Sequence, residues 1–575
     1  METRIFLCYD LDMIRELLKS IVLESAKGLH GVETGGLDVT IDKTSHEKFG
    51  DYSTNIAFGL SKTLKISPQE IAVKIAEKIN GPNHKEVERA EAVGGYVNFF
   101  LSKAFLREQL SIMAGQSDYG FNKKLGGQTV MVEFTDPNPF KLFHIGHLMS
   151  NAIGESIARL YEASGARVIR ANYQGDVGLH VAKAIWAKKN NPTETLEQAY
   201  ALGSKAYDDA GEDSSIRKEI EEINKQIYNR TDLETNKLYD KGRAESLEDF
   251  EKIYKKLGTK FDNYFFESEM GKLGLGIVAQ HPEVFTKSQG AIIFEGEKYG
   301  LHTRVFVSSQ GLPTYEAKEL GLNKKKFELY SGLDLSVVVT GNEINDYFKV
   351  LMKVMSLVIP SVAEKTKHVG HGMLRLPTGK MSSRTGDVIT AESFINEVKS
   401  KVLAKTSEES GKLDSLESNS EQIAIGAIKY SILKQSPGKD IIFDFDKSLS
   451  INGDSGPYLQ YTYARLRSVL HKAGDIDIKN HGYKFLDHES ELNLIKKLLD
   501  FPEAIQSASE LLTPSHLALY LYELASLANN FYEKIRILND DNPQRLMARL
   551  ELVDVVSQVL KKGLGILGIQ TLERI

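Results

Sequence analysis

The sequence of 575 residues contains one cysteine, Cys8, and lacks any apolar run of the roughly 18 residues that span a bilayer. One cysteine excludes an internal disulfide and any zinc site built from several cysteines. We expect Cys8 to be a small buried apolar side chain. The first ten residues contain too short an apolar stretch for a signal peptide. These features predict a cytoplasmic protein without a membrane partner.

The sequence also lacks an excess of positive charge. Its 72 lysine and arginine residues face 78 aspartate and glutamate residues, which gives a net charge of −6. A protein that coats nucleic acid is usually basic overall, so a nucleic-acid partner would have to meet local basic patches. The hydrophobic fraction of 41% and the charged fraction of 26% are typical of a globular protein, and the length predicts three or four domains.

The sequence pattern changes several times along the chain. In the first part, Ile71, Val73, Ile75 and Ile79 have helical spacing, and Gly94-Gly95 forms a turn before a short strand. From residue 458 onward the pattern is almost wholly helical. We therefore expect an α/β domain over 1–115, a catalytic domain over 125–395 with a helical insertion at about 190–260, a connective region over 396–450, and an all-helical domain over 451–575.

The central part predicts a parallel sheet. A buried strand is expected at 129–134, a proline-containing loop at 135–145, a helix over 147–163 that stops near Gly165, and a strand at 167–171. A strand, loop, helix and strand in this order predict a Rossmann-type α/β fold with right-handed crossovers. Further strands are expected at 291–294, 303–307 and 336–339, and the insertion is expected to be a helical hairpin.

Two histidines three residues apart, His144 and His147, follow the first buried strand in the segment His-Ile-Gly-His. Ligands of a parallel sheet bind at the carboxyl ends of its strands, near helix N-termini. Gly146 would let a planar base approach the backbone. An alternative is that both histidines cap or pack the start of the helix. Zinc is disfavoured because no third ligand lies nearby.

A second polar segment lies about 235 residues downstream, in Gly-Lys-Met-Ser-Ser-Arg-Thr-Gly-Asp, residues 379–387. Its Lys380 and Arg384 could neutralise charge on a departing pyrophosphate, and Met381, Ser382 and Ser383 complete a short loop suited to a polyphosphate. A flexible basic surface loop is the alternative. Together with the histidine pair, this loop resembles the paired signature of class I aminoacyl-tRNA synthetases.

Four segments resemble arginyl-tRNA synthetases over nearly the full length of the chain. They begin at Glu133 (Glu-Phe-Thr-Asp-Pro-Asn-Pro-Phe-Lys), at Gly379, and at Gly456 (Gly-Pro-Tyr-Leu-Gln-Tyr-Thr-Tyr-Ala-Arg), and they include Gly50–Asn55 with Gly95–Phe99 in the first domain. The resemblance implies ATP-dependent ligation of L-arginine to tRNA(Arg) through an arginyl-adenylate, with release of AMP and pyrophosphate. It also implies activation that requires bound tRNA.

The resemblance also implies roles for individual residues. Arginine would be bound by Glu133, Asn138, Tyr315 and Glu319, and carboxylates suit a guanidinium ligand. ATP would be bound by His144, Gly146, His147, Met381, Ser382 and Ser383, while Lys141, Lys380 and Arg384 would hold the pyrophosphate. Mg²⁺ would accompany ATP without a dedicated metal site. Contacts to tRNA would come from Asn55, Tyr96, Asn98, Tyr461, Arg465, Phe531 and Arg549, although core packing is the alternative for Phe531.

Some positions depart from the family pattern. Glu319 stands where the family usually has aspartate, and Ile344 stands where it often has glutamine, so one polar contact to arginine or adenosine must be replaced. Ser383 stands where the wider class carries a second lysine, for which Lys141 is thought to substitute. These departures leave open a tRNA-binding paralogue with impaired catalysis. A smaller nucleotidyltransferase would not need the long helical C-terminal region, and a cysteinyl enzyme would need zinc-binding cysteines. We expect a monomer.

Overall fold

The structure is a computed structural model that describes residues 13–27, 29, 36–81, 84–376, 389–409, 413–474 and 483–574. Cys8 and the segment with Lys380, Met381, Ser382, Ser383 and Arg384 lie outside these residues. The chain divides into two compact units. One contains residues 1–122, 462–504 and 520–562, and the other contains 123–461, 505–519 and 563–575. Within the described ranges, no helix is long and apolar enough to cross a bilayer.

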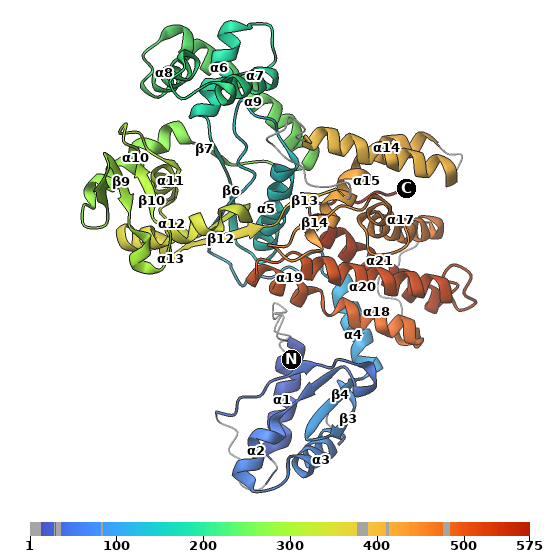
Figure 1. Ribbon diagram of the computed structural model, residues 1–575. Coiled ribbons are helices and arrows are strands. Elements are labelled where there is room, and N and C mark those ends of the chain that lie inside the picture. Colours follow the sequence, from blue (N-terminus) through green and yellow to red (C-terminus); the bar gives the residue numbers. More distant parts are fainter. Residues whose placement is uncertain are drawn as a thin grey trace. The chain divides into compact units, whose positions relative to one another are not determined.

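The first domain of the chain is built on a four-stranded antiparallel sheet in the order β1-β2-β4-β3. Figure 1 labels β3 and β4 of this sheet. Its strands and helices are α1 (Met13–Lys27), β1 (Asp42–Lys43), β2 (Tyr52–Thr54), α2 (Ile56–Leu64), α3 (Pro68–Ile79), β3 (Val87–Val93), β4 (Tyr96–Leu101) and α4 (Lys103–Gly115). Ser67 caps α3 and Pro68 begins it. Ile71, Ile75 and Ile79 are buried as expected, whereas Val73 is 37% exposed, because it lies on the solvent side of the helix.

The last part of the chain is helical, as the sequence predicts. Its helices are α17 (Gly456–Ala473), α18 (Glu489–Leu498), α19 (Phe501–Glu510), α20 (Ser515–Lys534) and α21 (Pro543–Ile566). His488 caps α18, with Glu491 completing a capping box. Glu491 also accepts a hydrogen bond from Arg549, 2.6 Å away, so this carboxylate connects α18 to α21.

The other unit is organised by a five-stranded parallel sheet in the order β12-β11-β5-β6-β7. Its strands are β5 (Thr129–Glu133), β6 (Arg167–Gln174), β7 (Asn263–Phe266), β11 (Leu333–Gly341) and β12 (Thr366–His371). Strands β6 and β7 are added on one side of β5, and β11 and β12 are then added on its other side. The sheet therefore has the doubly wound arrangement. Helix α5 (Ile145–Ala163) packs against β5, β6 and β11. The expected Rossmann-type fold is confirmed.

The helical insertion differs from the expected hairpin, because it contains three helices rather than two. After α6 (Leu179–Asn190) come α7 (Leu196–Asp209), α8 (Ser215–Asn229) and α9 (Leu233–Leu257). Helix α7 begins at a capping box formed by Thr195 and Gln198. Ile220, Ile223 and Ile227 of α8 pack in an apolar cluster with residues of α6. The turn between α7 and α8 is short and charged, which hid the break in the sequence pattern.

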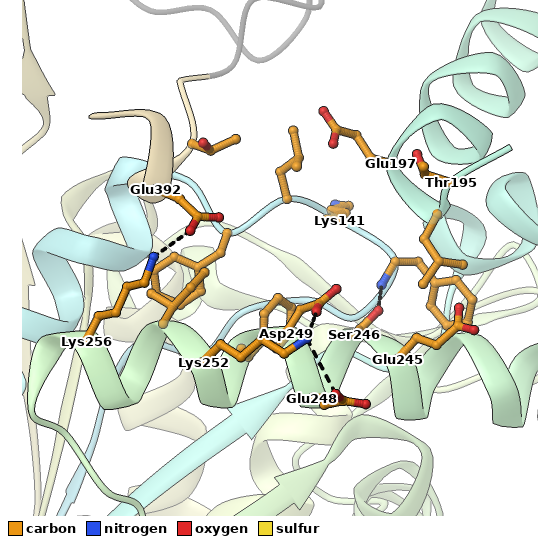
Figure 2. A pocket seen from close by; sticks show the side chains of 17 residues that line it. Lys141, Thr195, Glu197, Glu245, Ser246, Glu248, Asp249, Lys252, Lys256 and Glu392 are labelled. Carbon is orange, nitrogen blue, oxygen red and sulfur yellow. Dashed lines mark hydrogen bonds and ion pairs between the residues drawn. The ribbon is translucent and has the colours of Figure 1, made fainter. Parts of the chain in front are cut away.

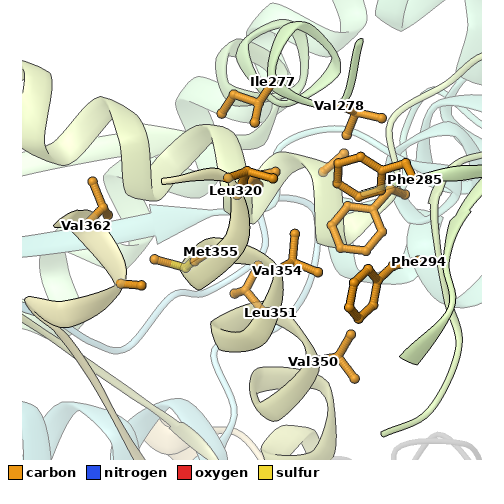
Figure 3. Packing of buried hydrophobic residues seen from close by; sticks show 14 of the residues in the cluster. Ile277, Val278, Phe285, Phe294, Leu320, Val350, Leu351, Val354, Met355 and Val362 are labelled. Atoms are coloured by element: carbon orange, nitrogen blue, oxygen red, sulfur yellow. The ribbon is translucent and has the colours of Figure 1, made fainter. Parts of the chain in front are cut away.

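Two of the expected strands, β9 (Ala291–Phe294) and β10 (Arg304–Val307), do not join the parallel sheet. They form a separate antiparallel sheet with β8 (Thr286–Ser288). An apolar cluster joins this sheet to three nearby helices, α10 (Glu267–Gln280), α11 (Tyr315–Leu329) and α12 (Asn345–Val358), as Figure 3 shows for Ile277, Phe285, Phe294, Leu320 and Leu351. This cluster packs α11 against the antiparallel sheet of β8, β9 and β10. Short helix α13 (Pro360–Glu364) follows α12.

The expected connective region is mostly helical. It contains most of α14 (Ala391–Glu409), α15 (Leu413–Leu433) and α16 (Phe445–Ser448), and its strand β14 (Ile441–Ile442) pairs in parallel with the earlier strand β13 (Leu374–Arg375). Lys429 of α15 is 1% exposed. Its Nζ donates to the carbonyl oxygens of Leu257, at 2.6 Å, and Gly568, at 2.8 Å. Burial lowers the pKa of Lys429 to about 7.

Candidate functional site

The loop between β5 and α5 has an unusual backbone. Thr135, Asp136 and Phe140 all have positive φ, at 81°, 45° and 68°, which side chains other than glycine rarely adopt. Hydrogen bonds hold the loop in this shape. The Thr135 amide donates to the hydroxyl of Ser150, and the Phe140 amide donates to the hydroxyl of Ser246, both at 2.9 Å. Strained backbone held by surrounding contacts is typical of functional sites.

His144 and His147 form the start of α5. Nδ1 of His144 accepts a hydrogen bond from the Gly146 amide at 3.1 Å, and Nδ1 of His147 accepts one from the His144 amide at 3.2 Å. The two rings stack, with centroids 3.7 Å apart. A Cβ at position 146 would lie 2.9 Å from Cε1 of His144, so glycine is needed for this stack. The capping role weighed as an alternative is therefore present.

This capping arrangement also fixes the chemistry of both rings. Burial lowers the pKa of His144 to about 4, with a further contribution from Lys141, and burial lowers the pKa of His147 well below its usual value. Both rings are therefore neutral at pH 7. Since each Nδ1 accepts a hydrogen bond, each Nε2 carries the proton and is a hydrogen-bond donor. Capping and anion binding are compatible, because they use opposite sides of each ring.

A cavity of about 510 Å³ lies at the carboxyl ends of β5 and β11. This is where the strand order reverses, which is the usual ligand position in a doubly wound sheet. His144, Gly146 and His147 line the cavity with Asn138, as expected from the sequence. The other lining residues are Thr135, Asp136, Ile145, Ser150, Val339, Thr340, Gly341, Glu343, Ile344, His371, Gly372, Met373, Leu374 and Ile389.

Lys141 lines a different cavity of about 880 Å³ between the β5–α5 loop and α9 (Figure 2). Five carboxylates line this cavity, and one of them, Glu392 at the start of α14, forms a 2.6 Å ion pair with Lys256. The ammonium of Lys141 lies 5.5 Å from the ring centroid of Tyr200. Burial lowers the pKa of Lys141. Lys141 therefore lies beside the histidines in sequence but lines a neighbouring space.

The proposed arginine-binding carboxylates Glu133 and Glu319 are buried together with a lysine. Oε2 of Glu133, at the end of β5, lies 2.8 Å from Nζ of Lys326, and both side chains are almost fully buried. Glu319 and Lys326 lie seven residues apart on α11 and therefore share one face of that helix. Burial and the charge of Glu133 raise the pKa of Glu319 to about 8. The structure thus brings Glu133 and Glu319 together.

Tyr315 is 61% exposed at the start of α11, and its backbone oxygen accepts a hydrogen bond from the Tyr347 hydroxyl at 3.3 Å. Ile344 lines the 510 Å³ cavity. The side-chain amide of Gln174, at the end of β6, is buried and has no hydrogen-bond partner among the described residues. Leaving a buried amide unpaired is costly, but Gln174 is not among the residues that line the cavity with Ile344.

The first domain exposes two of its three expected tRNA contacts. Tyr96 is 47% exposed and packs edge-on against Phe58, with ring centroids 5.2 Å apart. Asn55 is exposed, and its Oδ1 accepts a hydrogen bond from Thr40 at 3.0 Å. Asn98 is 4% exposed, although alternation along β4 places it on the same face as Tyr96 and opposite the core residues Val97 and Phe99. Its burial favours a structural role over direct contact with RNA.

Among the expected contacts of the helical region, Phe531 is 1% exposed, which favours the core-packing alternative over base stacking. Arg549 is buried and paired with Glu491 and Asp540. Tyr461 and Arg465 are partly exposed. Arg465 donates to Asn529 at 2.7 Å, and its guanidinium lies 5.1 Å from the ring centroid of Tyr532. Tyr532 is 39% exposed, so it is better placed than Phe531 to stack on a base.

The sequence interpretation missed three residues of interest: Lys326, His371 and Tyr532. Lys326 could have been found from its seven-residue spacing to Glu319 on an expected helix. Tyr532 directly follows Phe531. The prediction was therefore wrong by one position, because it chose the buried ring instead of the exposed one. His371 lies in His-Val-Gly-His, just before the second signature segment. Its position at a strand end is visible only once β12 pairs with β11.

Comparison with known proteins is consistent across the whole chain. Family models match in three places: the arginyl tRNA synthetase N terminal domain at residues 12–101, the class I (R) tRNA synthetase catalytic domain at 110–445, and the DALR anticodon binding domain at 459–575. The arginine–tRNA ligase of Clostridium acetobutylicum is 31% identical, covering 96% of this chain and 99% of the relative. That of Clostridium perfringens is also 31% identical, covering 97% and 99%.

Solved structures agree with these matches. Thermus thermophilus arginyl-tRNA synthetase has a TM-score of 0.78 and 26% identity, and the alignment covers 98% of this chain and 100% of that one. The Plasmodium falciparum enzyme, at 22% identity and a TM-score of 0.77 over 98% and 99% of the two chains, shares the fold. The catalytic-domain family alone matches more than half of the sequence. The chain therefore belongs to the arginyl-tRNA synthetase family of class I aminoacyl-tRNA synthetases.

Proposed function

We propose that this chain ligates L-arginine to tRNA(Arg) in two steps. The arginine carboxylate attacks the α-phosphate of ATP, which gives arginyl-adenylate and pyrophosphate. A ribose hydroxyl at the tRNA 3′ end then takes the arginyl group and AMP leaves. The observation that carries the proposal is the 510 Å³ cavity at the sheet's switch point, lined by both histidines of a family whose class uses ATP.

The phosphates of ATP would meet His144, Gly146 and His147. The start of α5 provides partial positive charge, and the two Nε2–H groups provide donors without bringing a formal charge. Donors held in place before the reaction stabilise charge that develops in the transition state. Lys141, Lys380 and Arg384 would hold the pyrophosphate, and Met381, Ser382 and Ser383 would complete the ATP site. These last assignments rest on the sequence resemblance.

The arginine side chain would be bound by Glu319 and Glu133, with Asn138 and Tyr315 near the reacting carboxylate. Three observations support this assignment. Both carboxylates are buried at the end of β5 and on α11, Asn138 lines the nucleotide cavity, and Tyr315 begins the same helix as Glu319. Charge-assisted hydrogen bonds contribute about 1.5–3 kcal/mol each, so a neutral analogue that loses two would bind roughly 10²- to 10⁴-fold less tightly.

The remaining parts of the proposal concern partners and surroundings. Mg²⁺ would arrive bound to ATP. Asn55, Tyr96, Tyr461 and Arg465 are the tRNA contacts that their exposure supports. We propose that the protein acts as a monomer in the cytoplasm.

ATP–pyrophosphate exchange with each amino acid, with and without tRNA(Arg), tests the proposal. We expect exchange with arginine alone, and only when tRNA is present. Exchange with another amino acid would contradict the substrate assignment, and exchange without tRNA would contradict the tRNA requirement. If no amino acid supported exchange while the protein still bound tRNA, the tRNA-binding paralogue would be selected instead.

A further inference from the structure

Two helix ends in the catalytic unit receive hydrogen bonds from the same two side chains. Helix α9 of the insertion ends at Leu257, and α21, the last helix of the chain, ends at Ile566. Residues 563–575 belong to the same compact unit as α9, whereas residues 543–562 of α21 belong to the other unit. The final carbonyl groups of a helix have no partners within that helix, so they need donors from elsewhere.

Lys429 makes the first connection between these two helix ends. Its Nζ reaches from α15 and donates to the carbonyl oxygen of Leu257 at 2.6 Å and to that of Gly568 at 2.8 Å. The side chain is 1% exposed. A lysine keeps two N–H groups even when it is neutral, so both hydrogen bonds can be made in either protonation state.

Arg159 makes the second connection, and it belongs to the helix that begins at the histidine pair. Its Nη1 donates to the carbonyl oxygen of Gly565 at 2.7 Å, and its Nη2 donates to that of Gly258 at 2.8 Å. Nε donates to Glu155 of the same helix at 2.7 Å, which holds the guanidinium in place. Positive charge is favourable beside helix C-termini. The end of α21 is thus connected to α5, α9 and α15.

Helix α9 also holds the loop that precedes the histidines. The hydroxyl of Ser246 accepts the hydrogen bond from the amide of Phe140, the residue whose φ is 68°. Gly242 lies so close to Phe140 that a Cβ there would be 2.4 Å from Cε1 of the ring. The ring of Tyr254 packs edge-on against that of Phe143, with centroids 6.0 Å apart. The shape of this loop therefore depends on the position of α9.

We propose that Lys429 and Arg159 are positioning residues that transmit tRNA binding from α21 to the nucleotide-binding loop. The inference rests on the proposed function, in which arginine activation requires bound tRNA. The path runs from the end of α21 through both cations to α9, and then from Ser246 to Phe140. A movement of α21 on binding tRNA passes through these hydrogen bonds to a backbone held in a rarely adopted conformation. Coupling between distant sites is carried by such contiguous contacts.

Helix α15 provides a matched control. Ser431 lies two residues after Lys429, is 5% exposed, and donates its hydroxyl to that of Ser448 at 2.9 Å. This hydrogen bond joins α15 to α16 and lies outside the path. The variant S431A therefore removes a buried hydrogen bond from α15 and leaves both helix ends connected.

The test measures three quantities in the full-length wild type and in K429M, R159K and S431A. These are the dissociation constant of tRNA(Arg), the dissociation constant of ATP without tRNA, and kcat of ATP–pyrophosphate exchange with arginine and saturating tRNA. In K429M and R159K we expect kcat to fall by about three- to thirty-fold, while both dissociation constants change by less than about two-fold. S431A should leave all three quantities unchanged. R159K keeps the charge but loses the two-armed fork that bridges the helix ends.

A double variant tests whether the residues belong to one path. S246A interrupts the path at its other end and should lower kcat by a similar factor. K429M/S246A should then lose no more than the worse single variant, because a path that is already broken cannot be broken again. Multiplied losses would overturn the inference, since the two residues would then act independently.

Unchanged kcat in K429M and R159K would also overturn the inference. Parallel losses of tRNA affinity, ATP affinity and kcat would do the same, because they indicate general damage to the fold. If K429M did not fold, R159K would decide by the same criteria. Wild-type exchange without tRNA would refute the inference and leave the ligation reaction intact, whereas absence of any wild-type exchange would reject the proposed function itself.

Discussion

Lys326 and Glu133 form an ion pair in the interior of the catalytic unit, with Nζ 2.8 Å from Oε2. The lysine comes from α11 and the carboxylate from the end of β5, so the pair joins the helix to the central strand of the sheet. Glu319 is buried on the same helix. Two carboxylates therefore share one internal cation, and an incoming guanidinium would bring the second positive charge.

Replacing Lys326 with methionine should destabilise the protein strongly. Breaking a buried pair leaves an uncompensated carboxylate, which typically costs about 3–5 kcal/mol. The free energy of unfolding can be measured by urea titration at pH 7. The double variant E133Q/K326M should recover much of the loss, and K349M, which breaks an exposed pair with Asp346, should change stability far less than K326M does. Equal losses for K326M and K349M would contradict the role of burial.

Arginine binding should strengthen as the pH rises through the pKa of Glu319. This pKa is raised to about 8, so the carboxylate is mostly protonated at pH 7 and mostly ionised at pH 8.5. The guanidinium needs the ionised form, so KM for arginine should fall by roughly eight-fold between these two values. The change is measured by exchange at saturating ATP and tRNA. E319Q should bind arginine weakly at every pH, and a wild-type slope that persisted in E319Q would assign the titration to another group.

Lys429 should make the protein more stable at alkaline pH. Its pKa is lowered to about 7 by burial, whereas an unfolded lysine titrates near its ordinary value of 10.5. Between these values the unfolded chain binds the extra proton, so stability rises with pH by up to about 1.4 kcal/mol per unit. Thermal midpoints at pH 7, 8 and 9 measure this slope. We expect a flatter profile in K429M than in the wild type, and parallel profiles would refute the prediction.

Tyr96 should contribute to tRNA affinity. Its ring is 47% exposed in the first domain, and stacking of a base on an aromatic side chain is worth about 1–3 kcal/mol. Y96A should therefore weaken tRNA(Arg) binding by roughly five- to hundred-fold in a filter-binding assay. Tyr299 is a matched control, because it is 46% exposed and lies in the other unit. Similar losses for Y96A and Y299A would indicate a non-specific effect.

Much of the fold followed from local sequence pattern. The buried strand at 129–134, the loop with two prolines and the helix before Gly165 were visible because their periodicity and breakers agree. The insertion was harder to interpret. Its residues are charged and periodic throughout, and the apolar stripe of α8, with Ile220, Ile223 and Ile227, does not by itself show how many helices the insertion contains. The separate antiparallel sheet was also not predictable, because strand pairing depends on contacts between distant segments.

The candidate site was predictable only in part. The motif histidines and Asn138 share a cavity because they lie close together in one loop. Tertiary contacts decide the rest. Asn98 and Phe531 have residue types that suit RNA, but packing buries both of them. His371 is the converse case, since one histidine at a strand end is usually unremarkable in a sequence. Only the pairing of β12 with β11 brings it to the wall of the 510 Å³ cavity.

The stacked rings at the start of α5 have a consequence for how this protein folds. The amide groups that orient His144 and His147 become available only when the first turn of the helix has formed. In a partly folded chain, each neutral imidazole would therefore be a mixture of its two tautomers. ATP affinity should therefore not appear before this first turn of α5 has formed.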